Sequence, residues 1–252
     1  MLNPSMFFWL PVPFMIIGAF GVTLFGNLPG QTAVAVAFNI LMALPAFWAL
    51  YYQLKFRAFY AIASVSVFAY AIESCGVLTG WPYGAFSYGN ELGPKLFSAV
   101  PLLLPFSYVP LVIGSLAIAK TFASHRLLQW LLGVVILVSY DLVLDPGAVK
   151  VGYWTWQSPG LYYDIPFTNY LGWFLSGSIG IAILNAFLST PIPRQQLPLF
   201  ISSFFWSAVF WTAVCIIEFM LIPSIIGALL TTFCIRLIKQ ESTNLVGGPS
   251  LT

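Results

Sequence analysis

The sequence predicts an all-α, polytopic integral membrane protein with about eight transmembrane helices. Sixty per cent of the 252 residues are hydrophobic and only 6% are charged. Apolar runs of about 20 residues recur along the chain, and a run of that length crosses the ~30 Å hydrocarbon core of a bilayer as a helix. No polar stretch is long enough to form a domain outside the membrane. We therefore expect a single integral membrane domain over residues 1–252, with 241–252 as a short polar C-terminal tail.

The predicted helices follow from the positions of the apolar runs. The first run begins close to Met1 without a basic segment or a small-residue cleavage pattern, so we expect it to stay in the protein as the first span. The predicted spans are 7–26, 32–53, 59–78, 98–119, 126–144, 167–189, 198–218 and 222–238. Glu218 and Pro223 mark a turn between the last two. The alternative is one span followed by a re-entrant piece, which would make seven spans.

The basic residues favour eight spans and indicate an orientation. With eight spans, one side of the membrane receives only Lys95 and Lys150, and the other receives seven basic residues, which are Lys55, Arg57, Lys120, Arg126, Arg194, Arg236 and Lys239. With seven spans the last two change sides and the count becomes five against four. Since lysine and arginine concentrate on the cytoplasmic side, we expect eight spans in a bacterial inner membrane with both termini in the cytoplasm.

The charges, the histidine and the cysteines exclude several function classes. A formal net charge of +2 without a basic cluster excludes nucleic acid as a partner. The single histidine, His125, excludes membrane di-iron hydroxylases and desaturases, because these enzymes hold their metal with several histidines. Cys75, Cys215 and Cys234 share no metal-ligand spacing and lie in or beside apolar runs, so we interpret them as structural. We therefore expect no metal and no cofactor.

Four of the seven acidic residues fall at one depth of the predicted bundle. They are Glu73 in the third span, Asp141 and Asp145 in the fifth and Glu218 in the seventh, and these spans all run outward. Because acids inside a membrane are unfavourable unless they face a polar cavity or a partner, they predict a site there. Asp141 and Asp145 lie one helical turn apart on the same face, where two carboxyls in a low dielectric should share a proton.

Structural roles are the alternatives for the same acids. Asp145 precedes Pro146 and could simply end the helix. Glu73 could bind the loop that follows it, and Glu218 could mark an ordinary turn.

Two long connections, 79–97 and 145–166, lie on the same side as these acids. Both are rich in glycine, proline, tryptophan and tyrosine, and so many aromatic side chains argue against disorder. The loops could roof a cavity over the acids with Trp81, Tyr83, Tyr88, Trp154, Trp156, Tyr162, Tyr163 and, in the next span, Trp173. The alternative is an interfacial aromatic belt, which membrane proteins commonly carry.

Two ordered motif blocks make the sequence similar to a known family. The first, which begins ESCGVLTGWPYGAFSYG, has its motif residues at Glu73, Gly76, Thr79, Gly80, Pro82, Tyr83, Gly84 and Tyr88. The second, which begins DLVLDPGAVKVGYWTW, has them at Asp141, Asp145, Pro146, Trp154, Trp156, Tyr162, Tyr163, Pro166, Asn169, Gly172 and Trp173. Over residues 73–110 and 141–177 the chain resembles the CruF-type carotenoid 1′,2′-hydratases, a family often described only as carotenoid biosynthesis proteins.

The resemblance implies a hydro-lyase that adds water across the terminal double bond of an acyclic (ψ) carotenoid end, such as that of γ-carotene or lycopene. It implies that Asp141 and Asp145 protonate the alkene to a tertiary carbocation and that Glu73 orients or deprotonates water, with Glu218 as a possible additional acid. Asn169 joins the aromatic side chains as a substrate-binding candidate. The expected partners are the lipophilic carotenoid, water and the lipid bilayer, with other carotenoid-biosynthesis enzymes as further candidates.

Two rival functions stay open at this point. A carotenoid end-group cyclase begins with the same protonation but closes a ring. A proton-coupled transporter or a pigment-binding protein would use the acids as relay or ligand sites. No inverted repeat supports transport, and every lysine falls at a predicted helix end or in a loop, whereas a Schiff-base pigment needs one deep in a span.

Overall fold

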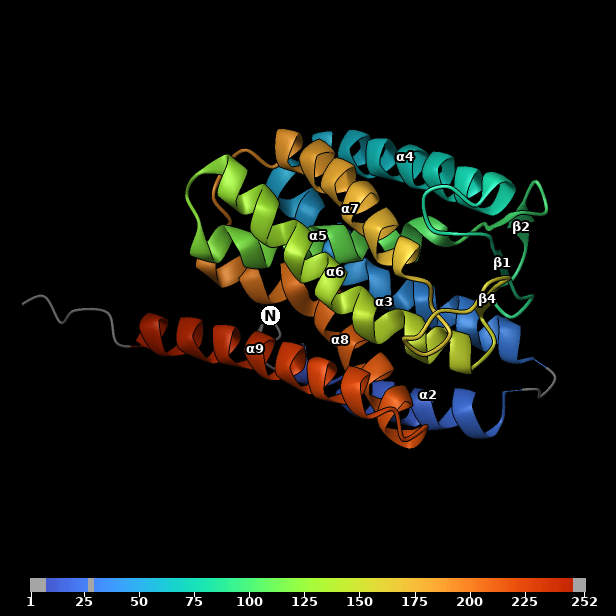
Figure 1. Ribbon diagram of the computed structural model, residues 1–252. Helices are drawn as coiled ribbons and strands as arrows, with labels where there is room; N and C mark the ends of the chain where they lie inside the picture. The colour runs from blue at the N-terminus through green and yellow to red at the C-terminus, as the bar shows by residue number, and fades with distance from the viewer. Residues whose placement is uncertain (1–7, 27–29, 247–252) are drawn as a thin grey trace, which may run out of the picture.

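Eight α-helices make up most of the part of the chain that the computed structural model describes, residues 8–26 and 30–246 (Figure 1). The helices are α2 (Val12–Leu24), α3 (Gln31–Leu54), α4 (Arg57–Thr79), α5 (Leu104–Phe122), α6 (Arg126–Lys150), α7 (Phe167–Phe187), α8 (Leu197–Ile217) and α9 (Leu221–Val246), with the short 3₁₀ turn η1 (Arg194–Gln196) before α8. Seven of them are long and apolar enough to cross a membrane, and α2, with 13 residues, is a shorter apolar helix. The predicted all-α polytopic fold is therefore confirmed.

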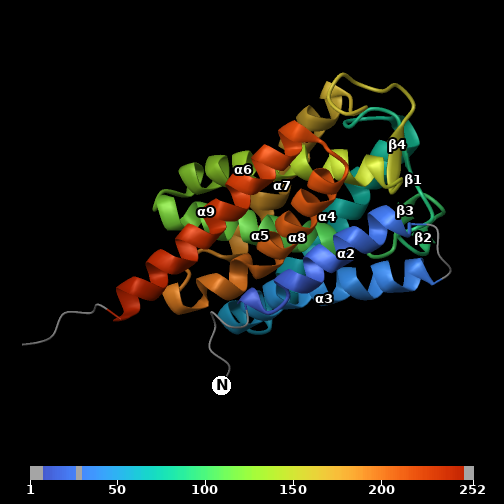
Figure 2. The same ribbon diagram turned by 90° about the horizontal axis from the view of Figure 1, so that it is seen from below.

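Successive helices run in opposite directions, so the connections alternate between two ends of the bundle (Figure 1 and Figure 2). α2 begins and α9 ends at one end, and the β-strands gather at the other, which we call the strand end. α5 and α8 form the centre, because 72% of the apolar window of each is buried, against 28% in α3 and α9. α8 packs against five other helices, α2, α3, α5, α6 and α9.

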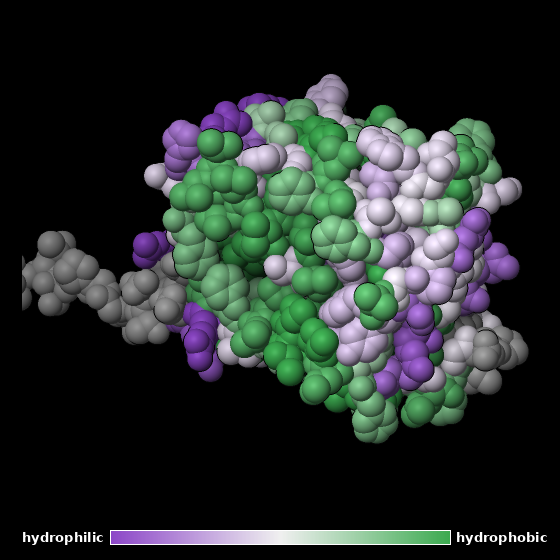
Figure 3. Space-filling model, in the orientation of Figure 1, coloured by the Kyte–Doolittle hydropathy of each residue, from purple (hydrophilic) through white to green (hydrophobic). Residues whose placement is uncertain are grey.

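The outer surface of the bundle is apolar between its two ends. In Figure 3, hydrophobic side chains cover much of the middle of the visible face, and hydrophilic ones lie toward both ends. The large exposed apolar side chains include Leu41, Trp48, Val67, Leu128 and Leu229. Such a surface is unfavourable in water and suits contact with lipid acyl chains, as expected of a multi-pass membrane protein.

Short strands at the strand end join the two long connections. β1 (Phe86–Tyr88) pairs antiparallel with β4 (Trp154–Trp156), with Ser87 opposite Thr155. β2 (Lys95–Leu96) pairs with β3 (Val100–Pro101) within the first connection. The pairing of β1 with β4 fixes the connection after α4 against the one after α6, so the side chains of both loops are held at the same end of the bundle.

The end of α6 differs from the prediction. The sequence predicts a span that ends at 144, but α6 continues through Pro146 to Lys150. Proline lacks the N–H that would bond to the carbonyl four residues earlier, which is that of Leu142. The Tyr162 hydroxyl donates a hydrogen bond to this carbonyl at 2.9 Å. Asp145 therefore lies inside the helix and does not end it.

Three other boundaries differ from the predicted ones. The first predicted span covers 7–26, whereas a turn at residues 10–11 precedes α2, which begins at Val12 and ends at Leu24. The fourth predicted span begins at 98, whereas α5 begins at Leu104, because β3 and a turn occupy the preceding residues. α9 extends to Val246, so the first residues of the predicted polar tail are helical, and 247–252 lie outside the described residues.

The basic residues divide between the two ends as predicted. Lys95 and Lys150 lie at the strand end, in β2 and at the end of α6. The other seven lie at or near helix termini of the opposite end or, for Arg236 and Lys239, in the second half of α9. The asymmetry supports an orientation with the strand end outside the cytoplasm, which remains a prediction.

Labelling tests this orientation. In a chain whose native cysteines are replaced by alanine, Ser158→Cys at the strand end should react with a membrane-impermeant maleimide added to intact cells. Ser124→Cys, in the α5–α6 connection, should react only after the cells are lysed. Both serines are exposed, so burial does not explain a difference. Labelling of Ser124→Cys alone in intact cells would reverse the predicted orientation.

Candidate active site

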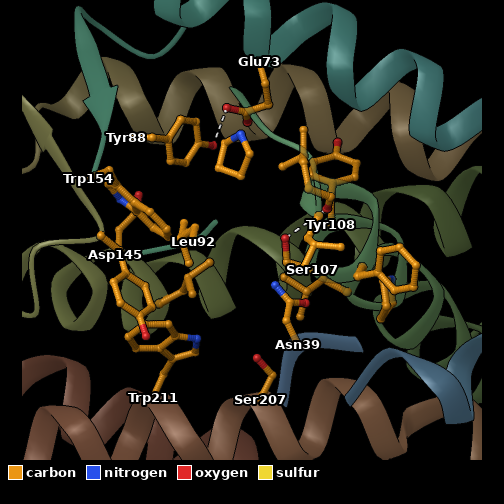
Figure 4. A pocket seen from close by; sticks show the side chains of 18 of the residues that line it. Asn39, Glu73, Tyr88, Leu92, Ser107, Tyr108, Asp145, Trp154, Ser207 and Trp211 are labelled. Carbon is orange, nitrogen blue, oxygen red and sulfur yellow. Dashed lines mark hydrogen bonds between the residues drawn. The ribbon is translucent and has the colours of Figure 1, made fainter. Parts of the chain in front are cut away.

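A cavity lies near the strand end of the bundle, between α3, α4, α5, α6, α7 and α8 and under β1 and β4 (Figure 4). Its volume is about 1260 Å³ when the part open to the surroundings is included, and its walls are mainly apolar and aromatic. Two carboxyl groups line it, those of Glu73 from α4 and Asp145 from α6. A lipophilic molecule can therefore meet acidic groups in this cavity.

The first carboxyl centre consists of Asp141, Asp145 and Asn169, all of which are buried. The Asn169 side-chain Nδ2 donates hydrogen bonds to Asp141 Oδ2, at 3.2 Å, and to Asp145 Oδ2. Asp145 Oδ1 accepts a further hydrogen bond from Trp154 Nε1 at 3.1 Å. Asp145 lines the cavity, and Asp141, one helical turn earlier, is not among the lining residues. The two aspartates are thus bridged by one amide, with Asp145 at the cavity wall and Asp141 behind that wall.

The second carboxyl centre is Glu73, which is buried near the end of α4. The Tyr88 hydroxyl donates a hydrogen bond to Glu73 Oε2 at 2.9 Å. Burial raises the pKa of Tyr88 well above its ordinary value, and the nearby Glu73 carboxylate raises it further. The phenol therefore stays protonated and remains a donor to Glu73.

The β1–β4 pair connects the two centres. Tyr88 on β1 lies opposite Trp154 on β4, with their rings edge to face at 5.8 Å. Each member of this cross-strand pair donates to a different carboxyl, Tyr88 to Glu73 and Trp154 to Asp145. The strand register therefore sets the position of one centre relative to the other, and a slip of one residue would turn both donors away.

Most of the aromatic residues predicted from the sequence line the cavity together with Asn169. Those that do are Tyr83, Tyr88, Trp154, Trp156 and Trp173. Trp173 also stacks on Tyr108 of α5, with ring centroids 5.6 Å apart. These aromatic side chains line the same cavity as the carboxyl groups, and the face of an aromatic ring attracts positive charge.

The remaining predicted site residues lie elsewhere. Trp81 is 58% exposed and does not line the cavity. Tyr162 binds the Leu142 carbonyl, and the Tyr163 hydroxyl accepts a hydrogen bond from the backbone N–H at the start of α9. Glu218 caps α8 and lies 3.7 Å from Lys150 Nζ, outside the lining residues, so its position matches the turn alternative.

The structure adds polar lining residues that sequence reasoning missed. Asn39, Ser107 and Ser207 come from α3, α5 and α8, and Figure 4 shows Asn39 and Ser207 across the cavity from Glu73 and Tyr88. The Ser207 hydroxyl is hydrogen-bonded to the Tyr140 hydroxyl at 2.5 Å. Asn39 lies inside an otherwise apolar run, and an amide side chain at that depth of a span is the signal that could have identified it as a site residue. Single serines in apolar helices carry little signal, because helix carbonyls can satisfy them.

The arrangement of these side chains gives little support for a metal site. Over residues 8–26 and 30–246, no three histidine, cysteine, aspartate or glutamate side chains come together as a metal-binding group. The polar groups on the cavity wall are carboxyl, hydroxyl, amide and indole groups.

Comparison with known proteins decides the family. A family model described as "Carotenoid biosynthesis protein" matches residues 30–234. The chain belongs to this family. The family expected from the two motif blocks is therefore confirmed. The matched region begins at α3 and ends within α9, so it includes every helix and strand that lines the cavity.

One curated relative in this comparison is the bisanhydrobacterioruberin hydratase of Haloarcula japonica. It is 37% identical over 192 residues, which cover 71% of this chain and 64% of the relative. The match thus spans less than two thirds of the relative's length. No solved structure matches the chain.

Proposed function

We propose that this protein is a carotenoid hydratase that adds water across the terminal C=C bond of an acyclic (ψ) end, such as that of γ-carotene or lycopene. The observation that carries the proposal is the β1–β4 pair, which holds two separate carboxyl centres on one aromatic cavity. The reaction needs an acid and a base on one apolar substrate. The printed name of the curated relative, a hydratase, supports the same reaction class.

The Asp141–Asp145 pair supplies the proton in this proposal. Two carboxyls that share one amide donor in a low dielectric cannot both stay ionised, so the pair keeps a proton. Asp145 faces the cavity and gives its proton to the less substituted carbon of the alkene. The π electrons form the new C–H bond, and the neighbouring carbon becomes a tertiary cation. Trp154 and Trp173 line the same cavity, and their π systems can stabilise this cation without reacting with it.

Glu73 completes the reaction from the other wall. A water molecule forms the C–O bond with the cation, and its proton passes to the Glu73 carboxylate. A return of that proton to the Asp141–Asp145 pair restores both centres. The sum is one alkene plus one water giving one tertiary alcohol, with no electron transferred, so the reaction requires no redox partner.

The depth of the site suits a membrane-spanning substrate. A carotenoid is about as long as the hydrocarbon core is thick, ~30 Å, so its end group lies near an interface. The cavity lies near the strand end, beneath the β1–β4 pair. A ψ end that enters the cavity from the bilayer would therefore reach both carboxyl centres while the polyene remains in lipid.

The origin of the oxygen tests the reaction type. Membranes that contain the protein, supplied with γ-carotene or lycopene under strict anaerobiosis in oxygen-18 water, should form a labelled tertiary alcohol without added reductant. Mass spectrometry of the extracted carotenoids measures the label, and membranes without the protein are the control.

Two results would contradict the hydratase. An unlabelled alcohol that forms only when dioxygen is admitted would assign the oxygen to an oxygenase reaction. A cyclised hydrocarbon in place of an alcohol would favour the end-group cyclase, in which the cation closes a ring before water reaches it.

A further inference from the structure

Tyr83 is held rigidly between two helices. A Cβ atom on Gly76 of α4 would lie 2.7 Å from Tyr83 Cδ2, and one on Gly172 of α7 would lie 2.5 Å from Tyr83 Cδ1. Both distances are shorter than real Cβ contacts, so only glycine fits on either side of the ring. The Tyr83 backbone carbonyl also accepts a hydrogen bond from Trp156 Nε1 at 3.1 Å. The ring is therefore fixed by both its edges and its backbone.

The hydroxyl at the end of this ring is buried and forms no hydrogen bond of normal geometry, although the Glu73 carboxyl and the Ser176 hydroxyl are polar neighbours of it. Tyr83 lines the cavity on the side of Glu73, because Gly76 lies one helical turn after Glu73 on α4. Burial raises the pKa of Tyr83 well above its ordinary value, and the Glu73 carboxylate is the next cause. The phenol thus stays protonated. The Ser176 hydroxyl of α7, which also forms no hydrogen bond of normal geometry, is buried beside this phenol.

A buried donor without a partner is unfavourable, and such groups are commonly satisfied by bound water. Here the donor borders a cavity and lies beside a carboxylate. Tyr88 already donates to Glu73 Oε2, which leaves the other carboxylate oxygen as an acceptor. A rigid donor and a free acceptor on one cavity wall are the two contacts that orient a water molecule.

We propose that the Tyr83 hydroxyl and the Glu73 carboxylate bind the water molecule that captures the cation. The phenol donates to one lone pair of the water oxygen, and the water donates one hydrogen to Glu73. The second lone pair then faces the cavity and forms the C–O bond. Tyr83 is thus a positioning residue for the nucleophile, and Gly76 and Gly172 are required because they hold its ring. This inference rests on the proposed hydratase function.

Deuterium exchange separates water binding from protonation. In deuterium oxide the Asp141–Asp145 pair delivers a deuteron to the alkene, and a cation that meets no water loses a proton and returns as deuterated alkene. Tyr83→Phe should lower alcohol formation about tenfold, the scale of one hydrogen bond. Exchange into the recovered alkene should persist, so the ratio of deuterated alkene to alcohol should rise by a similar factor.

Two further variants sharpen the test. Gly172→Ala keeps the phenol but displaces its ring, and it should raise the same ratio. Tyr60→Phe is the matched control, because Tyr60 is 60% exposed on the outer face of α4, and it should leave rate and ratio unchanged.

The opposing results are distinct. Alcohol formation by Tyr83→Phe within about twofold of the wild-type rate would overturn the water site, since a lost hydrogen bond has a larger effect. A parallel loss of alcohol formation and of deuterium exchange in Tyr83→Phe would also overturn it. Tyr83 would then be needed for folding or for the protonation step. A wild-type protein that forms neither alcohol nor deuterated alkene would instead overturn the hydratase function.

Discussion

Asp145→Asn is expected to lower alcohol formation at least ~100-fold, the usual scale for the loss of a general acid. The amide has the same size, and its oxygen can still accept from Trp154. Its NH2 group replaces the oxygen that accepts from Asn169, and it has no acidic proton to give. The protein should remain inserted and folded, because α6 continues beyond this position and is held there by Tyr162. Turnover by membranes with equal amounts of protein measures the effect.

Asp164→Asn is the matched control for this variant. Asp164 is an exposed aspartate of the α6–α7 connection with a positive φ of 66°, a conformation that asparagine tolerates well. The Asp164→Asn variant should therefore form alcohol at a rate near that of the wild type. Near-normal turnover by Asp145→Asn would move the proton donor to another carboxyl.

Asp141→Asn should be less damaging than Asp145→Asn, since Asp141 lies behind the cavity wall. The reverse order would make Asp141 the direct donor.

The helices were predictable because each apolar run is a local property of the chain. Every predicted span overlaps one helix, and the 7:2 division of basic residues appears at the two ends of the bundle. The end of α6 was not predictable in this way. Pro146 normally favours a helix end, and the hydrogen bond that lets the helix continue comes from Tyr162, sixteen residues later. A tertiary contact thus overrides a local preference.

The carboxyl centres were predictable in part. Acids are rare in membrane spans, so Glu73 and the aspartate pair stand out in the sequence, and spacing alone puts Asp141 and Asp145 on one face. Sequence could not reveal which aspartate faces the cavity, because this depends on how α6 is rotated against α7 and α8. It also could not reveal the register of β1 with β4, since strands of three residues carry almost no pattern.

The same argument explains why several loop candidates lie outside the cavity. Trp81, Tyr163 and Glu218 have the residue types of a site, and their positions in loops of the strand end agree with the prediction. Only packing separates them from Tyr88 and Trp154, which point inward. Composition predicts which loop is aromatic, whereas the fold decides which of its side chains face the carboxyls.

Glu73→Gln is expected to lower alcohol formation at least ~100-fold while leaving the first half of the reaction intact. Glutamine retains an oxygen that can accept from the Tyr88 hydroxyl, so the loop should stay in place, but it cannot take a proton from water. The Asp141–Asp145 pair lies on a different helix and keeps its own donors, Asn169 and Trp154. Substrate recovered from deuterium oxide should therefore carry deuterium.

The comparison of Glu73→Gln with Asp145→Asn then assigns acid and base to separate helices. Asp145→Asn should abolish both alcohol and exchange, because no proton reaches the alkene, whereas Glu73→Gln should abolish alcohol alone. Glu73→Asp, whose carboxylate is one methylene shorter, should recover part of the rate, since the group can still accept a proton from a less well placed water. If exchange disappears in Glu73→Gln and persists in Asp145→Asn, the roles are reversed, with Glu73 as the acid and the aspartate pair on α6 receiving the proton from water.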